Sequence, residues 1–284
     1  MKEKVLVFGG SGFIGGYLVN ELHKRGYDVT IADLNTPKYL KKESYKYSEC
    51  DILDKDQIKE VFAKEFDYVY NFAGLANLED ANEQPLKAFQ LNVIGNINII
   101  EACRIANINR FIYASSAYAM SAKGSFYGIS KLTSEKIIEE YSKKYNINFT
   151  IIRYGSLYSE QNHHNNYIYN LIKDALISGK IVHKGDGLEL REYIHAADAA
   201  ILSVDILEDE KYNNQHLILT GLERMKRLEL FNMIKEISGR ELEIQLNQSL
   251  RTDHYNLTPY SFQPTSSKKL IANPFIDMGQ GLLE

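Results

Sequence analysis

The chain has 284 residues and a formal net charge of −4, with 44% hydrophobic and 25% charged residues. These proportions are typical of a water-soluble globular protein with one large domain or two closely joined ones. The sequence has no block of Lys and Arg like that of a nucleic-acid-binding protein, and no apolar stretch long enough to span a bilayer. We therefore expect a cytoplasmic protein that binds neither nucleic acid nor membrane.

The first half of the chain alternates short apolar strands with amphipathic helices, which is the pattern of a parallel sheet covered on both faces. A helix after the first strand carries Ile14, Leu18 and Leu22 on one face, and a longer helix is expected over about 83–106. The strands are expected at 4–8, 28–33, 67–73, 110–116 and 149–154. This order predicts an α/β fold with a doubly wound parallel sheet, whose carboxyl edge would bind a ligand.

After about residue 155 the regular alternation loosens into a polar loop, a turn and mixed elements. Helices are expected near 167–178, 196–207 and 226–237, with strands at 216–220 and 242–246. We divide the chain into a first domain over 1–155 and a smaller C-terminal lobe over 156–284, which packs on the first and shares some segments with it. The cleft between them is the expected place for a substrate.

The segment VLVFGGSGFIGGYL follows a strand and opens a helix, with Gly9, Gly12 and Gly15 in a G-x-x-G-x-x-G spacing. Small residues let the backbone turn tightly and approach a pyrophosphate, which the amides and the dipole at the helix start then hold. A glycine string alone is weak evidence, and its alternative is a flexible turn. Its position between a strand and a helix favours dinucleotide binding.

Asp33 ends the second strand at close to the spacing of roughly 20 residues expected for the acid that binds an adenine ribose. Its carboxylate can accept hydrogen bonds from both ribose hydroxyls and would repel a 2′-phosphate, and no Arg follows to attract one. The sequence therefore predicts NAD rather than NADP as the cofactor.

Together, these ordered motifs resemble the extended short-chain dehydrogenase/reductases that act on nucleotide sugars. The resemblance covers nearly the whole chain. It is carried by GGSGFIGG, Asp33, CDILD at 50–54, FAGL at 72–75, LNVIGN at 91–96, YASS at 113–116, YGISK at 127–131, IIRYGSLY at 151–158 and REYIHAAD at 191–198. It implies a Rossmann-type NAD-binding domain followed by a substrate-binding lobe.

The resemblance also implies the residues that hold the cofactor. Asp51 and Ile52 would flank the adenine, and Tyr154 would pack near the nicotinamide; for Phe72 and Tyr154 the alternative is plain core packing. The implied NAD-binding set is Gly9, Gly12, Phe13, Ile14, Gly15, Asp33, Asp51, Ile52, Phe72, Ala73, Gly74, Asn92, Tyr127, Lys131 and Tyr154.

Tyr127 and Lys131, in the segment FYGISK, share one face of a predicted helix, where a surface pair is the alternative to a catalytic one. In the family, a hydroxyl at the end of the fifth strand meets the Tyr and Lys of the following helix, and Ser116 matches that hydroxyl. The resemblance therefore implies that Ser116, Tyr127 and Lys131 are catalytic, and we expect Ser115 to be structural.

The proposed chemistry explains these residue types. Removing a proton from a sugar hydroxyl needs a base with a pKa near the working pH, whereas a free tyrosine titrates near ~10. Lys131 and a positive nicotinamide ring are expected to lower the pKa of Tyr127. Ser116 can orient the same hydroxyl, and the Lys131 donors can hold the nicotinamide ribose.

On the substrate side, the resemblance implies that Arg191 clamps the diphosphate of a nucleotide sugar, since a planar guanidinium suits paired phosphate oxygens. The alternative is a surface arginine on an edge strand. Arg251 is a looser match for a second phosphate arginine, and Ser116 and Ser156 complete the expected substrate contacts.

No metal site is expected. His163 and His164 lie in the polar loop, and no carboxylate or cysteine spacing turns them into metal ligands. Cys50 and Cys103 show no ligand or redox spacing and are expected as reduced core residues. His195 and Asp198 are expected to be structural residues at a helix start.

The sequence departs from the family in the short interval between Ser116 and Tyr127, which would widen the sugar pocket. Ala117 and Tyr118 follow Ser116 where 4,6-dehydratases carry an acidic pair, so dehydration is disfavoured. Ser156 stands where the epimerases usually have Asn. Substrate identity is therefore less defined than fold or cofactor.

The expected function is NAD-dependent oxidoreduction at C4 of a nucleotide-diphospho-sugar through a 4-keto sugar, most simply as an epimerase. The alternatives are a net hexose or heptose 4-dehydrogenase that releases the 4-keto product, and a non-catalytic NAD-binding sensor or assembly protein. Either catalytic outcome fits the synthesis of polysaccharide precursors, an inference from family alone. A homodimer is expected through the long helix and the helix bearing Tyr127.

Overall fold

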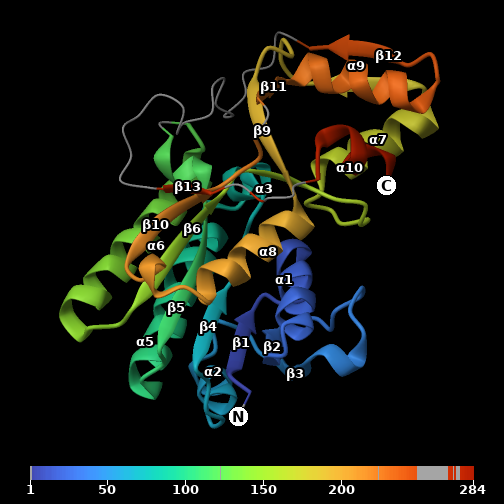
Figure 1. Cartoon of the computed structure of the whole chain (residues 1–284). Coiled ribbons are helices and arrows are strands. Elements are labelled where there is room, and N and C mark those ends of the chain that lie inside the picture. Colours follow the sequence, from blue (N-terminus) through green and yellow to red (C-terminus); the bar gives the residue numbers. More distant parts are fainter. Residues whose placement is uncertain (1, 122, 223, 248–267, 271, 273–275) are drawn as a thin grey trace.

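The computed structural model describes residues 2–121, 123–222, 224–247, 268–270, 272 and 276–284. Arg251, the second expected phosphate arginine, lies outside the described residues. Two bodies are visible in Figure 1: a large sheet flanked by helices and a smaller lobe that carries α7, α9 and β12.

The large sheet has eight strands, and every neighbouring pair in it is parallel. Its order is β13-β10-β6-β5-β4-β1-β2-β3, so the winding reverses between β1 and β4. This reversal point is where doubly wound sheets bind ligands. The predicted Rossmann-type α/β fold is confirmed. The strands are β1 (Lys4–Phe8), β2 (Asp28–Asp33), β3 (Lys46–Glu49), β4 (Tyr68–Asn71), β5 (Arg110–Ser116), β6 (Phe149–Tyr154), β10 (Gln215–Leu219) and β13 (Lys268–Leu270).

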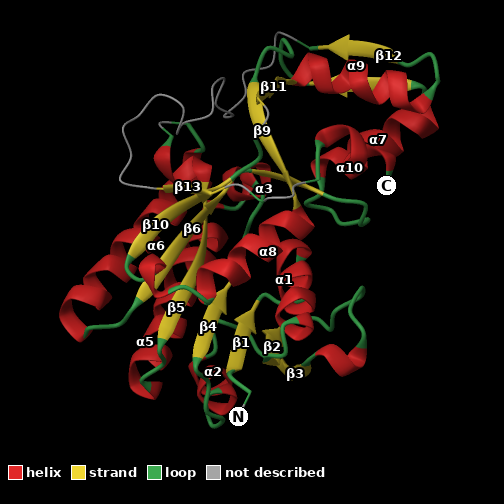
Figure 2. Ribbon diagram, in the orientation of Figure 1, coloured by secondary structure: helices red, strands yellow, loops and turns green. Residues whose placement is uncertain are grey.

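Helices cover both faces of this sheet, as Figure 2 shows. The helices α1 (Phe13–Lys24) and α8 (Ala196–Leu207) lie on one face, and α2 (Lys55–Val61), α5 (Asn96–Ala106) and α6 (Ser125–Tyr145) lie on the other. Alternate residues of a strand point to opposite faces, so Val5 and Val7 of β1 join the first core while Leu6 and Phe8 join the second. Each strand therefore contributes to two apolar cores.

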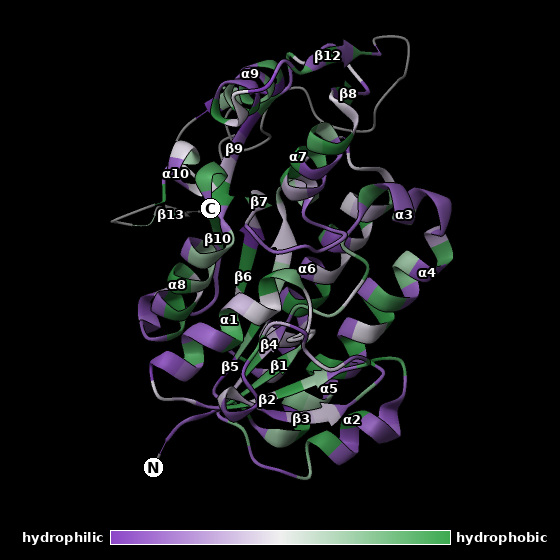
Figure 3. Cartoon of the chain, turned by 90° about the vertical axis from the view of Figure 1, so that its right-hand side faces the viewer, coloured by the Kyte–Doolittle hydropathy of each residue, from purple (hydrophilic) through white to green (hydrophobic). Residues whose placement is uncertain are grey.

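The hydropathy colouring in Figure 3 follows this arrangement: the central strands are mostly hydrophobic, whereas α3 (Leu78–Glu83) is mostly hydrophilic. Cys50 and Cys103 are buried, unpaired members of the second core, as expected. Among the described residues, no helix combines the length and the apolar character that a membrane crossing needs.

The helix expected over 83–106 is instead three consecutive helical segments. They are α4 (Pro85–Phe89), the π-helical segment η2 (Gln90–Gly95) and α5. Apolar spacing does not distinguish a wider π turn from an α turn, because both keep roughly the same face buried. The π segment contains Asn92, which contacts the loop after β4.

In its described residues, the smaller lobe contains two short sheets and three helices around a separate apolar core. Its three-stranded sheet has the order β11-β9-β7, and β12 pairs with β8. The helix α8 and the strand β10 also lie beyond residue 155 but belong to the large body, so the chain crosses between the bodies more than once. The lobe's elements are β7 (Ser156–Tyr158), α7 (Tyr167–Ser178), β8 (Lys180–His183), β9 (Leu190–His195), β11 (Arg224–Lys226), α9 (Arg227–Ser238), β12 (Glu243–Leu246) and α10 (Met278–Leu283).

A buried ion pair fixes α6 to the large sheet. The Glu135 carboxylate has no exposed surface, and it accepts hydrogen bonds from Arg153 Nε at 2.9 Å, from Arg153 Nη2 at 2.6 Å and from the Ser115 hydroxyl at 2.5 Å. Ser115 lies on β5 and Arg153 on β6, so one carboxylate joins a helix to two neighbouring strands. This contact gives Ser115 the structural role expected of it.

Replacing Glu135 tests this connection. Glu135→Gln keeps the side-chain volume but leaves Arg153 as a buried cation without its counter-charge, so we expect the free energy of unfolding to fall by about 3 kcal/mol. The matched control is Glu140→Gln on the same helix, which removes an exposed pair with Lys143 and should change stability by less than about 1 kcal/mol. Urea denaturation measures both, and equal effects would contradict the assigned role of Glu135.

Candidate active site

The glycine turn after β1 brings two backbone segments into unusually close contact. Gly9 has φ of +74°, and a Cβ there would lie 2.5 Å from the Ala73 nitrogen. A Cβ on Gly15 would lie 2.2 Å from the Gly9 carbonyl oxygen. No side chain fits at Gly9 or Gly15, so both positions require glycine. The glycine turn lies against the start of the loop after β4. Gly12 closes the turn by donating its N–H to the Gly9 carbonyl at 3.1 Å.

Asp33 lies beside this turn, at the end of β2. Its Oδ2 accepts a hydrogen bond from Ser11 N at 3.1 Å, and its Oδ1 accepts one from Asn35 N at 3.0 Å. Each carboxylate oxygen keeps a further lone pair for a ribose hydroxyl. The Ser11 hydroxyl is buried without a hydrogen-bond partner within the described chain. A turn too tight for any side chain, an unpartnered hydroxyl and an oriented carboxylate together fit a dinucleotide.

Asp51 and Ile52, which are expected to flank the adenine, lie just after β3. Asp51 Oδ1 accepts from Leu53 N at 2.9 Å, and the Ile52 carbonyl accepts from Asn98 Nδ2 at 3.0 Å. Phe13 and Ile14 begin α1 directly after the glycine turn. These contacts fix the backbone of the segment after β3, and contact with an adenine stays a prediction.

Asn92 holds the loop that contains Ala73 and Gly74. Its side chain is 1% exposed; Nδ2 donates to the Leu75 carbonyl at 3.0 Å and to Ser130 Oγ at 2.9 Å, and Oδ1 accepts from Leu75 N at 2.8 Å. The loop after β4 is thereby tied to α6. Within the described structure Asn92 thus positions the cofactor-side loop.

Phe72 and Tyr154 make core contacts. Their ring centroids lie 5.8 Å apart, and the Tyr154 hydroxyl lies 2.7 Å from Ser203 Oγ of α8. Burial raises the pKa of Tyr154 far above its usual value. These contacts match the packing alternative considered from the sequence, and a role for either ring beside a nicotinamide stays a prediction.

Ser116, Tyr127 and Lys131 converge where β5 ends and α6 begins. Tyr127 is 7% and Lys131 5% exposed, so the alternative of an exposed surface pair is wrong. The Ser116 hydroxyl lies close enough to the Tyr127 phenol to act on its pKa. Lys131 Nζ donates to the Ala114 carbonyl at 3.0 Å and lies 4.9 Å from the centroid of the Tyr113 ring.

Burial dominates the proton affinities of this group. It raises the pKa of Tyr127 to about 12, although the Ser116 hydroxyl acts in the opposite direction. Burial lowers the pKa of Lys131 to about 8, against the negative charge of Glu135. The sequence leads us to expect that Lys131 lowers the pKa of Tyr127. In the chain alone, burial instead raises this pKa. A positive charge added beside the phenol is needed to make it a base at neutral pH.

Tyr118 is a neighbour of the group that the sequence did not mark as functional. Its ring meets the Tyr127 ring edge to face, with centroids 6.0 Å apart, and its amide donates to Ser116 Oγ at 3.3 Å. The short connection between Ser116 and Tyr127 thus folds Tyr118 back against the phenol. The Tyr118 side chain therefore occupies space beside the phenol. The wider sugar pocket expected from the short interval between Ser116 and Tyr127 stays a prediction.

Arg191 and Ser156 lie on neighbouring strands of the smaller lobe. Arg191 is 2% exposed and lies on β9, the middle strand of its sheet, so the alternative of a surface arginine on an edge strand is wrong. Its Nη1 donates to the Leu190 carbonyl at 2.9 Å. Ser156 on β7 pairs in register with Tyr193 of β9.

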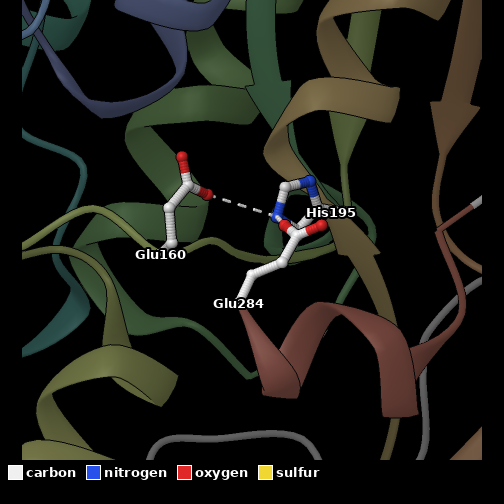
Figure 4. A group of neighbouring side chains, drawn as sticks. All are labelled: Glu160, His195 and Glu284. Carbon is white, nitrogen blue, oxygen red and sulfur yellow. Dashed lines mark ion pairs between the residues drawn. The ribbon is translucent and has the colours of Figure 1, made fainter.

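His195 lies close to the carboxylates of Glu160 and Glu284, as Figure 4 shows. Its Nε2 lies 3.5 Å from Glu160 Oε2 and 3.7 Å from Glu284 Oε2. Its Nδ1 accepts from Ala197 N at 3.3 Å, which caps α8 and confirms the expected helix start. An acceptor role at Nδ1 puts the ring proton on Nε2, where a metal would need a lone pair, so the geometry favours an electrostatic contact with the two carboxylates over a metal site.

Three comparisons place the chain among known proteins. The model of the NAD dependent epimerase/dehydratase family matches residues 5–219. The putative UDP-glucose 4-epimerase of Methanocaldococcus jannaschii is 27% identical over 98% of this chain and 95% of its own length. The UDP-glucose 4-epimerase of Erwinia amylovora is 31% identical over 69% of this chain and 71% of its own length.

The fold is also similar to that of solved epimerases. The structure of the UDP-glucose 4-epimerase of Thermotoga maritima with UDP-glucose has a TM-score of 0.83 and 22% identity, over 99% of this chain and 96% of that one. The family model spans most of the chain, and the glycine turn and Asp33 fit its cofactor. The chain therefore belongs to the NAD dependent epimerase/dehydratase family, with NAD as its cofactor.

Proposed function

We propose that the protein is an NAD-dependent epimerase acting at C4 of a nucleotide-diphospho-hexose, with a UDP-sugar as the substrate class. The observation that carries the proposal is the buried convergence of Ser116, Tyr127 and Lys131 beside an NAD-binding edge. The relatives described above are named as UDP-glucose 4-epimerases, which supports both the position of the reaction and the nucleotide.

In this proposal each residue of the group has one role. Ser116 donates or accepts a hydrogen bond at the C4 oxygen and orients it toward Tyr127. Tyr127 takes the C4 hydroxyl proton and later returns it. Bound NAD would supply the hydride acceptor and a positive ring whose charge favours the phenolate. Lys131 stands one helical turn after Tyr127, where its remaining donors can hold the nicotinamide ribose.

Epimerisation is favoured over release of a 4-keto sugar because the named relatives are 4-epimerases. Dehydration is disfavoured because Ala117 and Tyr118 supply no acid where elimination of water would need one. Arg191, Ser156 and Arg251 remain the proposed contacts to the substrate, with Arg191 for the diphosphate. A buried arginine gains from an anionic partner, which supports that role.

We further propose that the protein forms a homodimer through α4, η2 and α6. Large apolar side chains on these segments are solvent-exposed, from 40% for Leu132 to 72% for Leu86. Two copies of such a helical face would bury these residues against each other. The exposed members are Leu86, Ile94, Phe126, Ile129 and Leu132.

Tyr127→Phe tests the proposed base. The substitution keeps the buried ring but removes the proton acceptor, so kcat for interconversion of UDP-glucose and UDP-galactose should fall by about 10²- to 10⁴-fold. Tyr145→Phe is the control, since Tyr145 lies on the same helix and is 41% exposed. Turnover is followed by NMR of the sugar. Unchanged turnover in Tyr127→Phe would remove Tyr127 from catalysis, and steady accumulation of NADH by the wild type would favour a net dehydrogenase.

Asp33→Asn tests the choice of cofactor. Loss of the charged acceptors for the ribose hydroxyls should weaken NAD binding by about tenfold to a hundredfold, while NADP binding should weaken less or improve. Asp28→Asn, at the opposite end of β2, is the control. Calorimetric titration with each nucleotide measures the affinities, and an equal loss for NAD and NADP would contradict a role of Asp33 in discrimination.

The burial of Lys131 predicts a pH-dependent stability of the NAD-free protein. Its pKa is about 8 in the folded chain against 10.5 for an unburied lysine, so between these values the unfolded state binds more protons. Wild-type stability should therefore rise relative to Lys131→Met as pH increases from about 8 to 10.5, by about 3 kcal/mol. Urea denaturation across this range measures the difference, with Lys136→Met as the exposed-lysine control. A constant difference would contradict the buried amine.

A further inference from the structure

The guanidinium of Arg227 lies beside two aromatic rings. Arg227 is the first residue of α9, and its backbone N–H donates to the Glu189 carbonyl at 3.1 Å. The guanidinium carbon lies 4.2 Å from the Tyr167 ring centroid and 5.8 Å from the Tyr193 ring centroid. Nη1 is buried and has no hydrogen-bond partner within the described residues.

One donor atom of the Arg227 guanidinium, Nη1, therefore makes no hydrogen bond in the described part of the chain. Stacking on aromatic rings stabilises the charge of a guanidinium but does not satisfy its five N–H donors. A buried donor without an acceptor carries a free-energy cost, which an anionic ligand with paired oxygens would remove. Burial acts to lower the pKa of Arg227, but Tyr193, Tyr167, Tyr118 and Glu189 raise it, so the group stays cationic.

A chain of sequence and register neighbours connects Arg227 with the segment that carries Ser116. Tyr193, one of the two stacking rings, pairs with Ser156, which follows β6 almost directly. The last residue of β6, Tyr154, pairs with Ser116 in the large sheet. Tyr118, which interacts electrostatically with Arg227, has its ring against that of Tyr127. The cation is therefore connected to the catalytic group through residues in direct sequence or register contact.

Other arginines of the described chain differ in this respect. Arg224, three residues earlier, pairs with Glu192 at 3.0 Å, and Arg153 pairs with Glu135. Arg240, just after α9, donates to the Leu176 carbonyl at 3.1 Å. The guanidinium of Arg227 contacts aromatic rings, and its buried Nη1 is available to an acceptor that a ligand supplies.

We propose that Arg227 is a specificity-determining residue that binds an oxyanion of the nucleotide-sugar substrate. This inference rests on the proposed function. The oxyanion has two possible sources, the diphosphate of the nucleotide or a carboxylate on the sugar, and both offer the paired oxygens that a guanidinium fork binds. A purely structural clamp of α9 against α7 and β9 would instead affect stability alone.

The test is calorimetric binding of UDP, UDP-glucose and UDP-glucuronate to the NAD-loaded protein. Arg227→Met should weaken binding by about tenfold to a hundredfold, the cost of losing one charge-assisted contact. An equal loss for all three ligands identifies the diphosphate, and a loss confined to UDP-glucuronate identifies the sugar carboxylate. Arg240→Met is the control and should bind all three like the wild type.

Arg227→Lys keeps the positive charge but lacks the planar guanidinium fork. If Arg227→Met proves unstable in thermal melting, this second variant tests the proposed contact with the oxyanion. It should bind the affected ligands at least about threefold more weakly than the wild type. Unchanged affinity for all three ligands in a folded Arg227 variant would overturn the inference. Failure of the wild type to bind any of them would instead overturn the proposed function.

Discussion

The burial of a phenol and an amine on one turn of α6 is the constraint on which the rest of the site depends. Burial raises the pKa of Tyr127 to about 12 and lowers that of Lys131 to about 8, so at pH 7 the phenol is neutral while the amine is still mostly protonated. A buried phenol with this pKa keeps its proton at neutral pH unless a further positive charge lies beside it. In the proposed function, the basicity of Tyr127 therefore depends on whether NAD occupies the edge formed by the glycine turn and Asp33.

The surrounding contacts keep α6 in place at this edge. Glu135 ties the helix to β5 and β6 through Ser115 and Arg153, and Asn92 ties it to the loop after β4 through Ser130. The latter loop lies against Gly9, where no side chain would fit. The glycine turn, the loop beside it and α6 therefore form one connected unit, and a shift of any of them would displace the others.

Much of this unit could be predicted from the sequence. The strands β1, β2, β5 and β6, the helices α7 and α8 and the glycine turn follow from local periodicity and spacing. Ser116 and Tyr127 were singled out only by the resemblance to the family. The strands β3, β7, β8, β9, β11 and β13 were not predicted; β7, β11 and β13 have three residues each, too few to show alternation. The short strands form only because their partners, distant in sequence, supply hydrogen bonds.

The residues that sequence reasoning missed act through tertiary contacts. Glu135 meets Arg153 across a helix and a strand, and Arg227 meets Tyr167 across two helices, so no spacing marks either pair. From the sequence, Tyr118 is notable only because it stands where 4,6-dehydratases carry one of two acidic residues. Its packing on Tyr127 depends on how the short loop folds. Likewise, the burial of Arg191 follows from β9 being the middle strand of its sheet.

The central claim is that hydride leaves C4 of the sugar and returns to the same carbon in one site. The most direct test is to incubate the NAD-loaded protein with UDP-glucose deuterated at C4 and to follow both sugars by NMR and mass spectrometry. The account predicts UDP-galactose that keeps the deuterium at C4, with no lasting reduced cofactor. Deuterium lost from the sugar to accumulating reduced cofactor, or no epimer at all, would contradict it.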